Sequence, residues 1–147
     1  MTHTTDREPL TASLRVRIGQ HDAHYGGHLV DGAHILRLFG DLVTEITIRT
    51  DGDEGLLSEY ADIRFTAPVY PGDYLEATAR VVRRTKLRRF VELEARKVIA
   101  ASSESPSAAR VLPEAVTVCT ANATTVVPKP APRPTAKDHL PASTGGR

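Results

Sequence analysis

One long amphipathic segment constrains the fold of this chain more than any other feature. From Leu29 to about Ile48, apolar residues recur at steps of three and four, a spacing that places them on one face of a helix. The expected helix is about 18 residues long and is the one long helical pattern in the sequence. Any sheet formed by the remaining chain must therefore use this helix to cover its apolar face.

Alternating apolar and polar residues, the period of a half-buried strand, make up most of the remaining chain. These runs lie at residues 14–18, 60–66, 74–86, 87–100 and 111–121. The two longest runs are expected to form a hairpin closed near Thr85–Arg88. No second helix is available as a crossover between parallel strands. We therefore predict an α+β fold in which a curved antiparallel sheet wraps around one long central helix.

The length of 147 residues suits a single domain. We expect residues 14–121 to form this domain, preceded by a flexible lead-in at 1–13. Residues 122–147 are rich in proline and carry a net positive charge, which predicts a disordered tail.

Composition narrows the classes of function. A formal net charge of +1 does not favour nucleic acid as the main partner. Cys119 is the single cysteine, which excludes an intrachain disulfide and a multi-cysteine zinc site. No apolar run approaches the roughly 18 residues of a membrane span, and the first residues lack the apolar core of a secretory signal. We expect a cytoplasmic protein without a membrane partner.

The segment that leads into the helix has the highest density of side chains that could take part in catalysis. Four histidines and two aspartates lie between His21 and His34. Gly26 and Gly27 would let a ligand approach the backbone closely, next to the N–H groups of the expected helix N-terminus. Asp31 lies in the first turn, where a carboxylate could cap the helix or act on a substrate. His21, His24 and His28 lack the spacing of a known zinc motif, so we expect no metal.

Three motifs resemble a known enzyme family. They are HDAHYGGHLVDGAHILRLFGD at 21–41, DGDEGL at 51–56 and APVYPGDYLEA at 67–77. Their order over residues 14–100 is similar to that of hotdog-fold 3-aminobutyryl-CoA and β-alanyl-CoA ammonia-lyases. The resemblance implies a hotdog fold, and elimination of ammonia from a short β-aminoacyl-CoA thioester or the reverse addition. It also implies no cofactor beyond the CoA of the substrate, and a homodimer or dimer-based hexamer with active sites at the subunit boundary.

This chemistry requires a base for the proton next to the thioester carbonyl, and donors for the enolate oxygen. Glu54 is the first candidate for the base. Asp31 is the second, or could hold the substrate ammonium group. Backbone N–H groups of Gly27 or His28 are the expected donors, with Gly26 beside them, and His24 and Tyr25 could assist proton transfer.

Arginines at the expected hairpin tip could bind the phosphates of CoA, or could simply be a solvated, edge-protecting surface. They are Arg83, Arg84, Arg88 and Arg89.

Two other classes of function, one enzymatic and one non-catalytic, remain open. The same fold carries acyl-CoA thioesterases and enoyl-CoA hydratases, and a non-catalytic hotdog module could bind acyl-CoA without turnover. In related thioesterases a catalytic aspartate occupies the position of His24, and this departure disfavours thioester hydrolysis.

Overall fold

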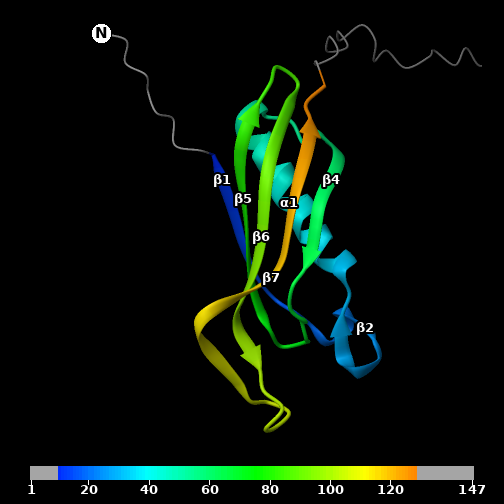
Figure 1. The fold of residues 1–147 in the computed structure, drawn as a ribbon, viewed down its shortest axis with the longest axis vertical. Coiled ribbons are helices and arrows are strands. Elements are labelled where there is room, and N and C mark those ends of the chain that lie inside the picture. Colours follow the sequence, from blue (N-terminus) through cyan, green and yellow to red (C-terminus); the bar gives the residue numbers. More distant parts are fainter. Residues whose placement is uncertain (1–9, 129–147) are drawn as a thin grey trace, which may run out of the picture.

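The computed structural model describes residues 10–128, in which one long helix lies against a five-stranded antiparallel sheet (Figure 1). The strand order is β1-β5-β6-β7-β4. The helix is α1 (Gly32–Asp51). The strands of the sheet are β1 (Thr11–Arg17), β4 (Leu56–Phe65), β5 (Tyr74–Arg84), β6 (Arg88–Ala101) and β7 (Ala109–Val126). The predicted antiparallel sheet around a central helix is confirmed, as is the hairpin closed at Thr85–Arg88.

The core lies between one face of the sheet and one face of α1. Phe39, Leu42 and Ile46 of α1 are fully buried, as the periodicity of the sequence predicts. Inward-facing positions of β5 and β6 include several alanines, and these short side chains let the helix approach the centre of the sheet closely. Burial of this shared apolar surface is the main force that holds the two layers together.

The helix starts and ends three residues later than predicted. Asp31 is its N-cap, with a carboxylate oxygen that accepts the backbone N–H of His34 at 3.4 Å. Leu29 and Val30 continue the apolar pattern but form the short strand β3 (Leu29–Val30), which pairs with β2 (Ala23–Tyr25). Gly52, in the left-handed conformation at φ 66°, ends the helix.

The terminal strands extend beyond the predicted domain limits of 14 and 121. β1 begins at Thr11, inside the expected lead-in, and β7 continues to Val126, inside the expected tail. Ala123 and Thr125 are buried and β7 pairs with both β4 and β6 there, so tertiary contacts rather than hydrophobicity keep this segment in the sheet. The rest of the predicted lead-in and tail lies at residues 1–9 and 129–147, outside the described residues.

A buried carboxylate joins the strand ends nearest the histidine-rich segment. Asp73 is fully buried and accepts the backbone N–H groups of Tyr70 and Ala101, each at 2.8 Å. Asp73 also pairs with the Lys97 ammonium at 2.9 Å, and this ammonium donates to the Pro68 carbonyl at 2.7 Å. The turn before β5, the end of β6 and the side chain of Lys97 thus depend on one carboxylate, which satisfies groups that would otherwise be buried without partners.

We expect Asp73→Ala to lower the free energy of unfolding by about 3–5 kcal/mol, because it leaves the Lys97 ammonium buried without its counter-charge. Urea denaturation measures this loss. The control is Glu92→Ala, which breaks the exposed 2.6 Å pair with Arg80 and should cost less than about 1 kcal/mol. The double variant Asp73→Ala/Lys97→Met should regain part of the stability. Equal losses in the two single variants would contradict a central role for Asp73.

Candidate functional site

The histidine-rich segment does not run directly into the helix. Gly26–His28 form a separate 3₁₀ turn, in which Gly27 and His28 have φ values of 76° and 62°. β3 and Asp31 intervene before α1 begins at Gly32. The prediction that Gly27 and His28 supply the N–H groups of the helix N-terminus is therefore wrong. The first-turn N–H groups of α1 belong to Gly32 and Ala33, while that of His34 is capped by Asp31.

An open cleft of about 530 Å³ lies at the first turn of α1. Its walls include Tyr25, Gly32 and Phe65, together with the chain from Ala67 to Val69. We call it the apolar cleft. The backbone of Val69 is fixed there, because its carbonyl accepts the Val30 N–H at 2.9 Å. The apolar cleft thus places an aromatic hydroxyl, a helix N-terminus and apolar side chains around one space.

A second cleft, of about 670 Å³, lies on the other side of the glycine turn. Gly27 and His28 line it together with Gln20, Tyr70 and serines of the β6–β7 loop. We call it the polar cleft. Since Tyr70 and Pro71 line the polar cleft and Ala67 to Val69 line the apolar one, the Asp73–Lys97 network positions a wall of each.

The structure separates the other residues predicted from this segment. His24 and Tyr25 are exposed and their rings meet edge to face at 5.0 Å, but of the two rings Tyr25 is the one in the lining of the apolar cleft. Gly26 is exposed at the start of the 3₁₀ turn. The His34 ring lies 3.8 Å from Asp22, so Asp31 and Asp22 contact different parts of the same histidine.

Glu54 is exposed in the turn that follows the other end of α1. The buried Thr47 hydroxyl donates to the Glu54 carbonyl at 2.6 Å, which fixes the backbone and leaves the carboxylate in solvent. A helix of 20 residues is roughly 30 Å long, so Asp31 and Glu54 are too far apart to act on one substrate within a single chain.

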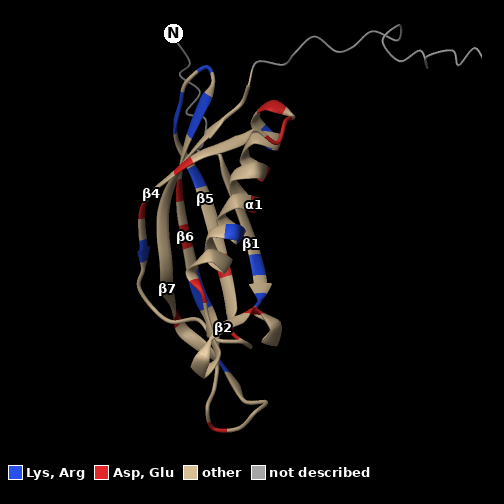
Figure 2. Ribbon diagram, turned by 90° about the vertical axis from the view of Figure 1, so that its right-hand side faces the viewer, with Lys and Arg blue, Asp and Glu red and all other residues tan. Residues whose placement is uncertain are grey.

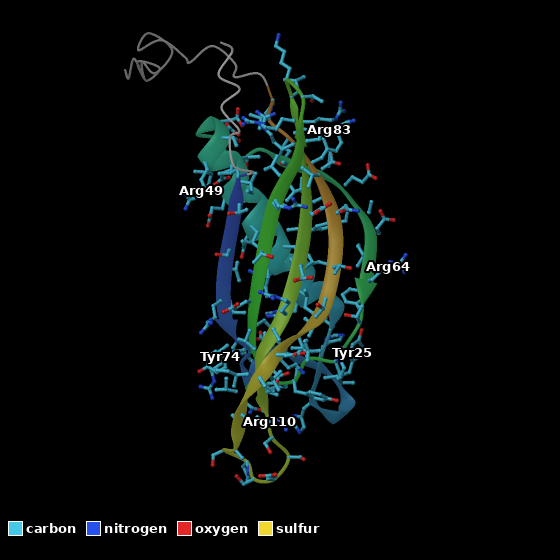
Figure 3. All side chains as sticks on the ribbon, turned by 60° about the vertical axis from the view of Figure 1, so that its left-hand side comes forward. Tyr25, Arg49, Arg64, Tyr74, Arg83 and Arg110 are labelled. Carbon is cyan, nitrogen blue, oxygen red and sulfur yellow. The ribbon has the colours of Figure 1, made fainter. Side chains whose placement is uncertain are left out.

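The arginines of the hairpin tip also lie at the Glu54 end. Figure 2 shows the basic tip and the acidic turn after α1 at the same end, and Figure 3 shows Arg83 and Tyr25 at opposite ends. Arg83, Arg84 and Arg88 are exposed, and the Arg83 guanidinium lies 4.1 Å from the centre of the Phe90 ring. These three cations are accessible to an anionic ligand.

Arg89 is a correction to the predicted phosphate-binding set. It is 4% exposed, and its guanidinium bonds both carboxylate oxygens of Asp51, at 2.8 and 2.9 Å. It also donates to the carbonyls of Thr85 and Arg88. Both terminal nitrogens of Arg89 are used within the protein, and its Nε is buried without a partner among the described residues. Arg89 therefore ties the hairpin tip to the end of α1 and is not accessible to a phosphate in solvent.

The comparisons with known proteins decide the family. The chain is 48% identical over 117 residues to the 3-aminobutyryl-CoA ammonia lyase of Acetoanaerobium sticklandii, a match that covers 79% of this chain and 93% of that relative. The chain belongs to the hotdog-fold 3-aminobutyryl-CoA ammonia-lyase family. No protein-family model matches the chain.

Solved structures agree with this family. The β-alanyl-CoA:ammonia lyase of Clostridium propionicum superposes with a TM-score of 0.77 at 31% identity, covering 81% of this chain and 85% of that one. A hexameric hotdog-fold thioesterase of Campylobacter jejuni gives a TM-score of 0.63 at 18% identity, covering 77% and 79% of the two chains. That second likeness shows the hotdog fold alone.

Two further titratable side chains of this chain, Cys119 and Tyr60, have structural roles. Burial raises the pKa of the Cys119 thiol to about 11, so the thiol stays protonated near neutral pH and is a poor nucleophile. Burial, followed by the charges of Asp41 and Cys119, raises the pKa of Tyr60, whose hydroxyl donates to the Leu36 carbonyl at 2.7 Å. In residues 10–128 no group of three metal-ligating side chains is found, and none of the helices there is long and apolar enough to span a membrane.

Gly32 and Phe65 were not among the site residues predicted from the sequence. Phe65 is the last residue of β4, and Gly32 lies within the motif at 21–41 as the first residue of α1. Their proximity depends on the tertiary structure, which brings the end of β4 onto the start of α1.

Proposed function

We propose that this protein eliminates ammonia from a short β-aminoacyl-CoA thioester to give the 2-enoyl-CoA, and catalyses the reverse addition. The observation that carries this proposal is the 48% identity, over almost the whole length of the relative, to a 3-aminobutyryl-CoA ammonia lyase. The apolar cleft at the first turn of α1 and the polar cleft beside the glycine turn provide the space such a substrate needs. CoA thioesters and a single reduced cysteine fit a cytoplasmic location.

The reaction needs a base at the carbon next to the thioester carbonyl and an anionic group near the ammonium on the neighbouring carbon. A carboxylate, assigned to Glu54, removes the proton from the carbon next to the thioester carbonyl. The resulting negative charge on the thioester oxygen is stabilised by backbone N–H groups, which we assign to Gly32 and Ala33. The carbon–nitrogen bond then breaks, the electron pair of the enolate forms the double bond, and the protonated amine leaves as neutral ammonia. We assign Asp31 to the binding of the substrate ammonium group.

We infer a dimer that joins the two ends of α1 in one site. β4 is an edge strand of the sheet and exposes Leu56, Leu57, Ile63 and Phe65. An exposed apolar edge strand is a pairing surface. Two-fold pairing of β4 with its copy would set the two α1 helices antiparallel, because α1 packs along β4 through Tyr60. Glu54 of one subunit then lies near Asp31 of the other.

The first test is a spectrophotometric assay with crotonyl-CoA and acryloyl-CoA. We expect loss of the enoyl-thioester absorbance that depends on ammonium, and Glu54→Gln should lower kcat by roughly 10²–10⁴ because it removes the base. Glu114→Gln is a matched control, since Glu114 is an exposed carboxylate of β7, away from the strand proposed for pairing. Absorbance loss without ammonium would instead indicate a hydratase, or a thioesterase if free thiol appears. Near-normal turnover by Glu54→Gln would remove Glu54 as the base.

Subunit mixing tests the shared site. Glu54→Gln and Asp31→Asn should each be nearly inactive alone, and asparagine can still cap α1. Coexpression of the two variants should restore about a quarter of wild-type activity, because half of randomly formed dimers are mixed and each has one intact site of two. Coexpression of two differently tagged Glu54→Gln chains is the control. No recovery in the mixed preparation would contradict a site built from both subunits.

The exposed arginines are expected to bind the CoA phosphates. Exposed ion pairs contribute about 0.2–1 kcal/mol each, so replacing Arg83, Arg84 and Arg88 with glutamine should raise KM about tenfold and weaken its salt dependence. The control variant Arg17→Gln/Arg110→Gln removes two exposed arginines at the end of the molecule opposite the hairpin tip (Figure 3). An unchanged KM in the triple variant would mean that the tip is ordinary surface.

A further inference from the structure

Phe65 and Gly32 make an unusual contact at the start of α1. The Phe65 ring lies directly over Gly32, and a Cβ atom added to that glycine would be 2.3 Å from Cζ of the ring. Any side chain at this position would therefore displace the ring. The glycine allows an aromatic wall to lie against the first helical residue, next to the N–H groups that we assign to the thioester oxygen.

Most of the other residues that line the apolar cleft are hydrophobic, and the hydroxyl-bearing side chains among them are those of Tyr25 and Thr66. Val30, Ile35 and Val69 are buried beneath it, while Phe65 is 54% exposed toward its opening. None of these side chains carries a charge. An apolar group that enters this cleft gains free energy by leaving water, in proportion to its apolar surface.

The likeness to two lyases suggests which substrate group this wall contacts. One relative is named for 3-aminobutyryl-CoA and the other for β-alanyl-CoA. These two acyl groups differ by a single methyl group on the carbon that carries the amine. That methyl is the apolar part of an otherwise polar reacting end, and a site that distinguishes the two needs an apolar contact next to the reacting carbons.

We propose that Phe65, held over Gly32, contacts this methyl group and makes the enzyme prefer a four-carbon acyl chain over a three-carbon one. The inference rests on the proposed function for its substrate class. The polar cleft is the alternative location, but Gln20, His28 and the serines of the β6–β7 loop line it. A methyl group gains little against such hydrogen-bonding groups, whereas the Phe65 ring offers an apolar surface.

Saturated thioesters test this preference without turnover, because butyryl-CoA and propionyl-CoA carry no amine to eliminate. The dissociation constants of both are measured by calorimetry for the full chain. One methyl group in an apolar site is worth about tenfold, so the wild type should bind butyryl-CoA about tenfold more tightly than propionyl-CoA. Phe65→Ala should remove most of this ratio, because butyryl-CoA loses the contact with its last methyl group and propionyl-CoA has no such contact to lose.

Val111→Ala is the matched control, since Val111 is a 74% exposed apolar side chain of β7 that does not line the apolar cleft, and its ratio should equal that of the wild type. Phe65→Leu, which keeps an apolar side chain, should give an intermediate ratio and supplies the same comparison if Phe65→Ala does not fold. Equal ratios in the wild type and the Phe65 variants would overturn the inference. A ratio that depends on Phe65 in a protein without ammonium-dependent turnover would overturn the proposed reaction and leave the methyl contact standing.

Discussion

The structure depends first on the burial of one helix against one sheet. α1 provides the apolar surface that covers the inner face of all five strands, and the small residues of β5 and β6 allow the close approach. A helix that spans the sheet has its two ends at opposite ends of the molecule. The groups that flank it, Asp31 before its start and Glu54 after its end, are consequently far apart. The separation of these two carboxylates is a consequence of the fold.

Polar networks then fix the chain at each end of this core. Near the start of α1, Asp73 and Lys97 hold the turn that walls both clefts. Near its end, Arg89 joins the hairpin tip to Asp51, while Thr47 holds the backbone of Glu54. Each network satisfies buried polar groups, so its loss would be costly. The second network leaves the side chains assigned to chemistry at its end, Glu54 and the exposed tip arginines, in solvent.

Periodicity and motif order were sufficient to predict the sheet, the helix and the family. The start of the helix was misplaced because Leu29 and Val30 fit the helical pattern although Asp31 caps the helix after them. Arg89 was assigned to phosphate binding because its partner, Asp51, is 38 residues away in the sequence, and a local charge pattern cannot reveal such a pair. The contact of Phe65 with Gly32 is likewise tertiary and was not predictable from spacing.

The distribution of charge indicates why one chain would be an incomplete catalyst. A base in open solvent has no apolar surroundings to favour proton abstraction from carbon, and donors at a helix end are weakened by water. Pairing two copies along β4 would bring Glu54 of one subunit to the apolar cleft of the other and would cover both from solvent. The same step would bring the tip arginines of one subunit toward the clefts of the other, where the rest of the CoA thioester extends. Assembly would therefore create the low-dielectric environment that the elimination requires, from surfaces that are exposed to water in the single chain.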